Sequence, residues 1–326
     1  MTRFFSRTRR AWAQAAFAGA LSLAFTAPAW SQAGTVRLVV GYAAGGPVDA
    51  AARQFAPALA KELGRTVIVE NRAGVAGALG AESVARAPAD GATLYFAASP
   101  TLTISPHVLK SMPIDPVKDL TPISPVSTYA NALVVNKDLP IHALAELIAY
   151  AKANPGKLSY GSAGMGASNH LSGELFAKQI GATLTHVPYK GNAPAMTDVI
   201  GGQLSMMFDI VSTARNYISS GRVRAIAVTS RERNASLPEV PTMREAGLPG
   251  YEVIGWYGVY GPAAMPAALV TQVNAAVNRA LADDELKKQW VAQGYDLWPG
   301  TPAVLAAQQR KDFEMWRGVT GGIRFE

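Results

Sequence analysis

Two glycine-rich stretches of this chain have the residue types that hold an anion without using charge. The first is Gly41-Tyr42-Ala43-Ala44-Gly45-Gly46-Pro47-Val48-Asp49, between an expected strand and an expected helix. Glycine lets the backbone approach a ligand closely, and the first turn of a helix offers unpaired N–H groups at the positive end of the helix dipole. An anion is the expected guest, and a tight structural turn is the alternative. For Asp49 a helix N-cap is favoured over a ligand contact, because a carboxylate at a helix start competes with an anionic ligand.

The second stretch is Tyr160-Gly161-Ser162-Ala163-Gly164-Met165-Gly166-Ala167-Ser168-Asn169-His170. Its backbone, hydroxyl and amide donors are uncharged, and they suit a carboxylate held by neutral hydrogen bonds. A plain loop is the alternative. His170 opens the next expected helix and could touch a ligand, although a capping or surface role is more common for such a histidine.

Motifs for catalysis, metals or cofactors do not appear in the sequence. Ser162 and Ser168 do not lie in the G-x-S-x-G frame of a hydrolase nucleophile. The dinucleotide fingerprint is absent from the first stretch, and the second lacks the lysine of a P-loop. The histidines, at positions 107, 142, 170 and 186, have no metal-ligand spacing. We therefore assign no catalytic residue, metal or cofactor, although a nucleophile–base pair can also form between residues distant in sequence.

Strands alternate with helices along most of the chain, which indicates an α/β fold with a parallel sheet and helices on both faces. The first series has strands at 36–40, 66–70 and 93–97, with helices at 50–63 and 78–86. The second has strands at 133–136, 158–160, 185–187, 204–208 and 223–228, with helices at 144–153, 170–180 and 194–201. Two successive series suggest two lobes. Each glycine-rich stretch follows a strand and precedes a helix.

The C-terminal part is expected to be helical, at 267–282, from 283 onward, and at 301–317. Helices that follow the second series can return to pack on the first lobe. The segments near 127–133 and 253–260 would then cross between the lobes and form the hinge.

The first 33 residues have the layout of a secretory signal peptide. Four arginines precede an apolar run at 15–27, which is shorter than the about 20 residues of a membrane span, and Ser31-Gln32-Ala33 offers a cleavage site. Removing the four arginines takes the formal charge from +7 to +3, and no basic cluster typical of nucleic-acid binding remains. The chain has no cysteine, which excludes disulfides, thiolate metal sites and a lipidated cysteine. We expect an exported, periplasmic protein.

Several segments, in one order, carry a resemblance to a known family. They are residues 39–46 with Asp49, then 69–81 (Val69-Glu70-Asn71-Arg72-Ala73-Gly74-Val75-Ala76-Gly77-Ala78-Leu79-Gly80-Ala81), then 160–171, then His186-Val187-Pro188-Tyr189-Lys190-Gly191, and finally 201–204 with Phe208-Asp209. Over essentially the whole mature chain, the sequence resembles the substrate-binding components of tripartite tricarboxylate transporters, the Bug family.

The resemblance implies a type II periplasmic binding protein, a two-lobed Venus flytrap with its ligand cleft between the lobes. Lobe 1 would comprise 34–131 with 255–326, and lobe 2 would comprise 132–254. Family members hold one carboxylate with the second-lobe loop, here Ser162 to Asn169, and close the first-lobe loop, here Ala44 to Asp49, over the other end. The resemblance also places Ser99-Pro100-Thr101 and the turn around Asp209 in the cleft lining. Tyr189 is a further candidate, with lobe packing as its alternative.

One departure from the family pattern bears on the ligand. Ala44 stands where the family has a proline, and Pro47-Val48 replaces a small polar pair. Proline also lacks an N–H donor. A more apolar wall would suit an aromatic or longer aliphatic carboxylate, such as terephthalate or adipate, better than citrate.

Three functions follow as alternatives. The first is a monomeric, non-enzymatic receptor that delivers a small carboxylate to the membrane subunits of a tripartite tricarboxylate transporter. The second is a sensor that presents the same ligand to a signalling receptor. The third is an exported hydrolase, which would require a nucleophile–base pair.

Overall fold

The structure is a computed structural model that describes residues 34–320. The expected signal peptide, residues 1–33, lies outside these described residues. Residues 35–320 belong to one compact unit. Between residues 34 and 320, the helices are too short or too polar for any of them to cross a membrane.

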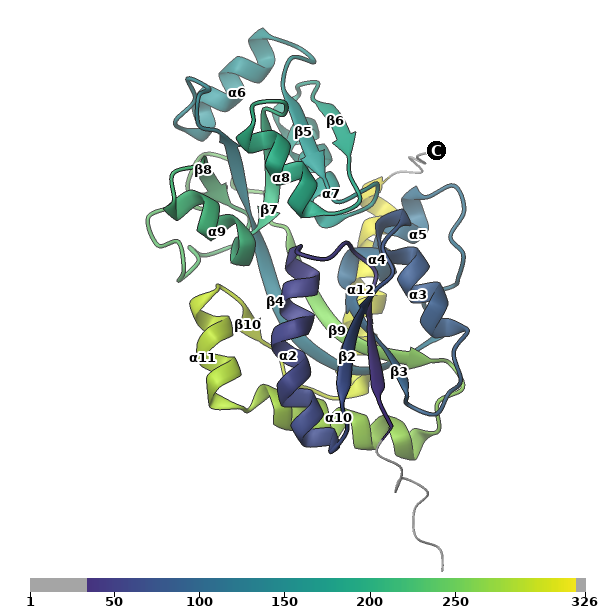
Figure 1. Cartoon of the computed structure of the whole chain (residues 1–326). Coiled ribbons are helices and arrows are strands. Elements are labelled where there is room, and N and C mark those ends of the chain that lie inside the picture. The colour runs from purple at the N-terminus through teal and green to yellow at the C-terminus, as the bar shows by residue number, and fades with distance from the viewer. Residues whose placement is uncertain (1–33, 321–326) are drawn as a thin grey trace, which may run out of the picture. The chain divides into compact units, whose positions relative to one another are not determined.

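A first sheet begins with three parallel strands: β1 (Val36–Val40), β2 (Val67–Asn71) and β3 (Thr93–Ala98). Helix α2 (Pro47–Leu63) links the first two strands, and the short turn η1 (Val75–Gly77) and α3 (Ala78–Ala85) link the next two (Figure 1). Gly64 ends α2 in the left-handed conformation, with its N–H bonded to carbonyls of the last turn, as a glycine C-cap does. These elements agree with the predicted ones to within three residues at each end.

The expectation of a purely parallel sheet is wrong, because a reversed strand lies inside the sheet. Strand β9 (Ile254–Pro262) runs antiparallel to β3 on one side and to β4 (Leu120–Asn136) on the other. The order is β2-β1-β3-β9-β4, and the two-residue β10 (Asp296–Leu297) pairs with β4. A strand that returns from a distant part of the sequence leaves no local signal of its direction.

The second sheet repeats this arrangement. Strands β5 (Ser159–Ser162), β6 (Thr185–Pro188) and β7 (Met206–Ile210) are parallel, and β4 runs antiparallel to β7 and to β8 (Val223–Val228). The helices of this part are α6 (Leu144–Ala153), α7 (Ser168–Ile180), α8 (Asn192–Ile200) and α9 (Val211–Ser219). The two α/β series of the sequence therefore form two lobes, as predicted.

Strand β4 belongs to both sheets and is far longer than the four residues predicted for it. Its first part pairs with β9 as far as Ala130, and its last part pairs with β7 and β8 from Asn131 onward. The first part was not predicted because it contains Pro122 and Pro125, and proline has no N–H to donate to the hydrogen-bond ladder of a sheet. The register with β9 shifts after each of these prolines, which accommodates them. The change of partner lies beside the predicted lobe boundary, and the boundaries and the hinge stay predictions.

The C-terminal helices α10 (Ala267–Leu281), α11 (Asp284–Ala292) and α12 (Pro302–Thr320) pack on the first lobe, as predicted. Arg279 of α10 pairs with Glu62 of α2 at 2.6 Å, and Asp312 of α12 accepts a hydrogen bond from the Trp256 indole at 2.7 Å. Leu305 lies in the first-lobe core beside Val39 and Tyr95.

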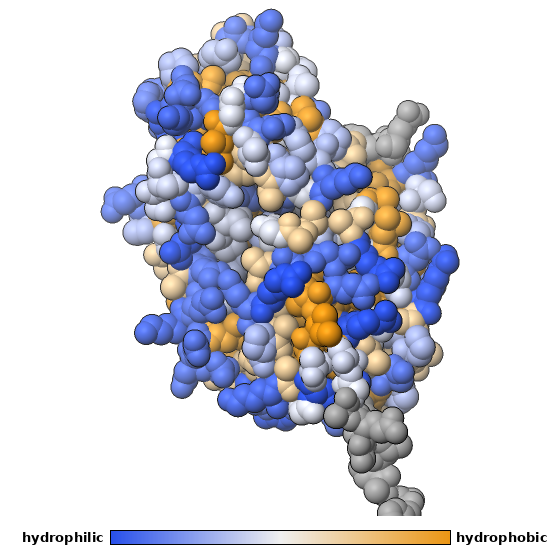
Figure 2. All heavy atoms as spheres, viewed as in Figure 1, coloured by the Kyte–Doolittle hydropathy of each residue, from blue (hydrophilic) through white to orange (hydrophobic). Residues whose placement is uncertain are grey.

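The first lobe has an apolar core that includes Val39, Tyr95 and Leu305, the second lobe has two cores, and one further cluster joins the lobes. Buried side chains of α6, α7 and the second sheet form one core, and those of α8, α9 and the other face of that sheet form another. Ile104, Val108, Leu171 and Trp316 connect α12 and the short helices α4 (Ser99–Thr103) and α5 (Ser105–Val108) to α7 of the second lobe. In Figure 2, residues of intermediate hydropathy lie where the two lobes meet, and orange patches are also visible on the upper and lower parts of this face.

Candidate functional site

The first turns of several helices converge on a small cavity between the lobes. The cavity has a volume of about 10 Å³, which is room for a single water molecule. Val48 lies in the first turn of α2, Ser168 and Asn169 begin α7, Asn192 begins α8, and Ile210 precedes α9. Helix N-termini carry unpaired N–H groups and positive partial charge, so together they favour an anion at this point.

The first lobe supplies a mostly apolar wall. Tyr42, Val48, Ala98, Pro100 and Tyr129 line the cavity from this side. The Tyr42 hydroxyl is 3.0 Å from both the Ala76 carbonyl and the Thr101 hydroxyl. Burial raises the pKa of Tyr42 to about 12, so the ring stays neutral. This wall can pack against the apolar part of a ligand.

The second lobe supplies uncharged polar groups. Ala163, Ala167, Ser168, Asn169, Asn192 and Ile210 line the cavity from this side. The Asn169 side-chain oxygen accepts from the N–H groups of Ala163, at 3.0 Å, and His170, at 3.1 Å. Because its oxygen is engaged in this way, the Asn169 amide can offer its NH₂ group to a ligand.

Asp209 lies behind Asn192 and does not line the cavity. Its carboxyl accepts hydrogen bonds from the Asn192 amide and from the Thr213 hydroxyl, the latter at 2.8 Å. Burial raises the pKa of Asp209 to about 6, although these hydrogen bonds oppose the shift. Asp209 therefore orients Asn192, which the sequence did not single out although it directly follows the quoted 186–191 segment.

The predicted N-cap role of Asp49 is wrong. Gly46 is the N-cap of α2, and Asp49 is the third residue of the helix. The Asp49 carboxylate accepts from Gly45 N–H at 2.9 Å, from Asn71 at 2.8 Å and from Arg53 at 3.0 Å, and these bonds lower its pKa despite burial. The residue turns away from the cavity lining and holds the first loop in shape.

The remaining first-lobe candidates, from the first loop and from α4, do not line the cavity. Ala44 and Gly45 are exposed, and Pro47 is the first residue of α2. Ser99 accepts from the Trp256 N–H at 3.1 Å, and Thr101 donates to the Ala76 carbonyl at 2.7 Å. Both therefore lie beside lining residues without lining the cavity themselves.

Ser162 and two histidines form a buried cluster under the second loop. The Ser162 hydroxyl is 2.6 Å from Nε2 of His186, and the His186 ring stacks on His170 with 4.1 Å between centroids. Burial lowers the pKa of His186 to about 4 and that of His170 to about 3, so both are neutral at pH 7. His170 is buried and accepts from Gly166 N–H at 3.0 Å, so it supports the loop from inside and is not at the surface.

Three further candidates lie near the cavity without lining it. Gly166 approaches Ser105 and Val108 of the first lobe so closely that a Cβ would lie 3.0 Å from each side chain. Gly164 and Tyr189 line a neighbouring space of about 230 Å³. Of the cavity-lining residues, Ala98, Tyr129, Ala167, Asn192 and Ile210 were not among the predicted site residues.

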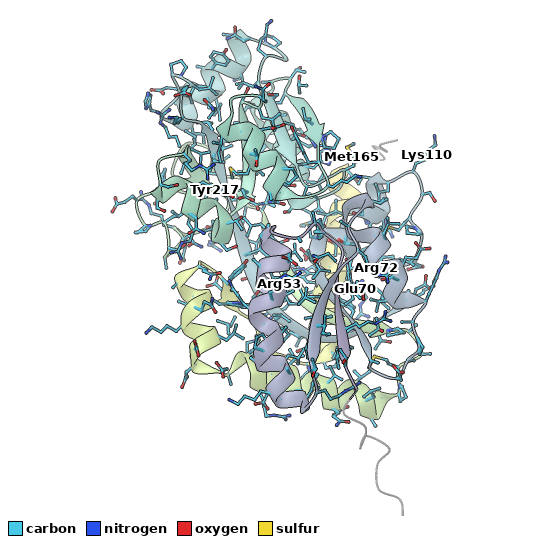
Figure 3. All side chains as sticks on the ribbon, viewed as in Figure 1. Arg53, Glu70, Arg72, Lys110, Met165 and Tyr217 are labelled. Carbon is cyan, nitrogen blue, oxygen red and sulfur yellow. The ribbon has the colours of Figure 1, made fainter. Side chains whose placement is uncertain are left out.

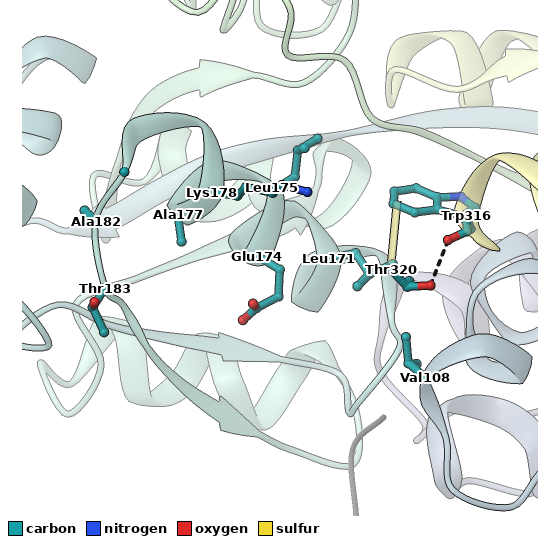
Figure 4. A pocket seen from close by; sticks show the side chains of 11 residues that line it. Val108, Leu171, Glu174, Leu175, Ala177, Lys178, Ala182, Thr183, Trp316 and Thr320 are labelled. Carbon is teal, nitrogen blue, oxygen red and sulfur yellow. Dashed lines mark hydrogen bonds between the residues drawn. The ribbon is translucent and has the colours of Figure 1, made fainter. Parts of the chain in front are cut away.

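An apolar groove lies outside the cleft, between α7, α5 and the end of α12 (Figure 4). It has a volume of about 460 Å³, and Leu171, Leu175 and Trp316 line it together with Glu174 and Lys178. The cavity, though smaller, is the better anion site because the helix N-termini face it and not the groove.

The two-lobed α/β fold with a cavity between its lobes matches the architecture of solved periplasmic binding proteins. The family model of the tripartite tricarboxylate transporter family receptor matches residues 51–313. The chain belongs to this family of solute receptors, and the resemblance drawn from the sequence is confirmed.

Relatives in sequence and solved structures support membership of this family. A Pseudomonas sp. (strain P51) protein, named for the tcbD-tcbE intergenic region, is 39% identical over 86% of this chain and 83% of its own. The periplasmic binding protein BugD is 34% identical, with a TM-score of 0.86 over 89% of this chain and 99% of its own. An R. palustris protein solved with adipate is 33% identical, with a TM-score of 0.86; the match covers 89% of this chain and 98% of that protein. MatC of Rhodopseudomonas palustris, solved with malate, is 32% identical, with a TM-score of 0.84; the match covers 87% of this chain and 98% of MatC.

Proposed function

We propose that this receptor captures a small carboxylate, held at the meeting point of the helix N-termini. The convergence of α2, α7, α8 and α9 on one cavity carries the proposal. The ligand carboxylate would accept hydrogen bonds from Ser168, from the Asn169 and Asn192 amides and from backbone N–H groups of the first turns. Tyr42 and Val48 would cover its apolar part.

Closure of the lobes is the proposed mechanism. A cavity with room for one water molecule does not admit a carboxylate, so the lobes must separate for entry and close around the ligand. A ligand that contacts both lobes only when they are closed shifts the equilibrium toward that form. We place the lobes at 34–131 with 255–326 and at 132–254, and the hinge on β4 and β9, where these strands pass from one lobe to the other.

The ligand class follows from the two walls. The first lobe contributes Tyr42, Val48, Pro100 and Tyr129, which favour an aromatic or aliphatic body over the hydroxyl-rich body of citrate. Similar proteins were solved with adipate and with malate. We propose a dicarboxylate or an aromatic carboxylate as the ligand.

Export and delivery complete the proposal. We propose that residues 1–33 are a cleaved signal peptide, that the mature chain acts in the periplasm as a monomer, and that it delivers its ligand to the membrane subunits of a tripartite tricarboxylate transporter. Delivery to a signalling receptor would use the same site and a different partner.

The Ser162–His186 pair is the observation that favours a hydrolase. A neutral histidine 2.6 Å from a hydroxyl can accept its proton. However, Ser162 is fully buried, its hydroxyl also contacts the Gly164 backbone at 3.2 Å, and it does not line the cavity. We therefore propose that the pair supports the loop. Measurable hydrolysis of simple esters that disappears in Ser162→Ala would instead support the enzyme.

The test is a thermal-shift screen of the chain from residue 34 against mono-, di-, tri- and aromatic carboxylates. A ligand specific for the native state stabilises it by about 2.7 kcal/mol at a hundredfold excess over its Kd. We expect a shift with adipate or terephthalate, less with citrate, and the ligand recovered unchanged. Calorimetry that shows citrate bound more tightly than both would reject the ligand class. No shift with any carboxylate, repeated after unfolding and refolding to remove retained ligand, would reject the receptor.

A further inference from the structure

A second space adjoins the cavity. We call it the outer chamber, and it has a volume of about 230 Å³. Tyr42 and Ala163 line both spaces, so the two are neighbours that share one wall. The outer chamber is lined by Gly41, Tyr42, Gly74, Val75, Ala76, Gly77, Leu109, Ala163, Gly164, Met165, Tyr189 and Lys190. Met165 lies at the level where the two lobes meet (Figure 3).

The wall of the outer chamber on the first lobe is a strained turn held in place. Val75 and Ala76 both have φ of 50°, in the left-handed region that such residues rarely adopt. The Ala76 carbonyl accepts hydrogen bonds from Tyr42, at 3.0 Å, and from Thr101, at 2.7 Å. Strain of this kind persists where the surroundings enforce it, and it is concentrated at ligand sites.

Apolar side chains face one cation across the outer chamber. Val75, Leu109, Met165 and the Tyr42 ring contribute apolar surface, and Lys190 is the charged residue in the lining. Lys190 is exposed and forms no ion pair with the residues at positions 34–320. Its ammonium group is therefore available to an anion.

The backbone on both sides of Lys190 is fixed. Tyr189 N–H donates to the Ser162 carbonyl at 2.9 Å, and the Tyr189 hydroxyl donates to Asp198 of α8 at 2.5 Å. Gly191 lies so close to the first lobe that a Cβ would be 3.2 Å from that of Ala43. These contacts hold the backbone of Lys190 beside the outer chamber.

We propose that the outer chamber is a subsite for the far end of an elongated ligand, with Lys190 pairing with a second acidic group. The ligand class is a dicarboxylate whose two acids are separated by an apolar body: one carboxylate at the helix N-termini, the body along Tyr42 and Met165, and the other carboxylate at Lys190. This inference rests on the proposed carboxylate receptor and adds the feature that selects ligand length and charge.

The experiment is calorimetric titration, at low ionic strength, of the chain from residue 34 and its Lys190→Gln variant. The ligands are two matched pairs: adipate with hexanoate, and suberate with octanoate. We expect the variant to lower the diacid-to-monoacid affinity ratio by about twofold to fivefold, because a solvent-exposed ion pair contributes modestly and is screened by salt. Lys157→Gln is the matched control, since Lys157 is exposed and lies outside both spaces.

A second variant tests the space and not the charge. Met165→Trp would fill the outer chamber, and we expect it to lower the affinity for suberate more than that for succinate. If carboxylates bind but Lys190→Gln leaves the diacid-to-monoacid ratio of the wild type unchanged, the subsite is wrong and the receptor stands. If no acid of any length binds the wild type, both proposals fail.

Discussion

At the scale of the residue, Asp209 is the group whose titration should appear in the stability of the protein. It is buried behind Asn192, and its pKa is about 6 in the folded chain against 3.8 for an ordinary aspartate. The folded state therefore binds the proton more tightly than the unfolded state. The stability that comes from the protonated group is fully present below pH 3.8 and is lost as the pH rises through about 6.

We predict that Asp209→Asn removes this pH dependence. Asparagine resembles the protonated carboxyl, and the Thr213 hydroxyl can accept as well as donate. Between pH 4 and pH 7.5, the free energy of unfolding of the wild type should fall by about 2.4 kcal/mol more than that of the variant. Urea denaturation at the two pH values measures the difference. Parallel behaviour of the two proteins would contradict the raised pKa.

At the scale of the element, the start of α11 is specified by one side chain. Asp283 is the N-cap, and its carboxylate accepts from the N–H groups of Glu285 and Leu286, both at 3.1 Å. The sequence predicted a helix from residue 283 onward, and the structure confirms it.

We predict that Asp283→Ala lowers the free energy of unfolding by about 1 kcal/mol, because two N–H groups of the first turn lose their acceptor. Asp284→Ala is the control: it removes the same charge from the same turn but leaves the cap in place. Chemical denaturation at pH 7 compares the two variants. Equal losses would mean that charge near the helix start matters and the cap geometry does not.

At the scale of the whole molecule, closure depends on small residues where the lobes touch. Ala43 of the first lobe faces Gly191 of the second, and Gly164 lies close to Ala76 across the same boundary. There is little room for a larger side chain at these contacts, because atoms in folded proteins are closely packed.

We predict that Ala43→Leu acts as a wedge between the lobes. The variant should bind its carboxylate about tenfold more weakly, and its radius of gyration with saturating ligand should stay near that of the ligand-free protein. Ala153→Leu, at an exposed position on α6, is the control. Isothermal titration and small-angle X-ray scattering measure the two effects. A wedge variant that compacts and binds like the control would show that Ala43 and Gly191 do not limit closure.

The sequence by itself determined the local structure and the class of protein. Glycine-rich turns, helix ends such as Gly64 and Asp283, and runs of β-branched residues are local signals, so most helices and strands lie within a few residues of their predicted places. The two lobes and the return of the C-terminal helices were also predictable. So was the role of the second loop as one wall of the cavity, because Ser168 and Asn169 begin α7 there.

The tertiary structure decided which residues face the cavity. Tyr129 reaches the cleft because β4 pairs with both sheets. The prolines in β4 prevented this part of the strand from being predicted. Asn192 was identified by its place in the cavity lining, where Asp209, 17 positions away, orients its amide. Asp49 turned out to hold its own loop, since Asn71 and Arg53 reach it from β2 and α2. These contacts join residues far apart in sequence, and sequence spacing carries no record of them, because a side chain's partner is set by how whole elements pack.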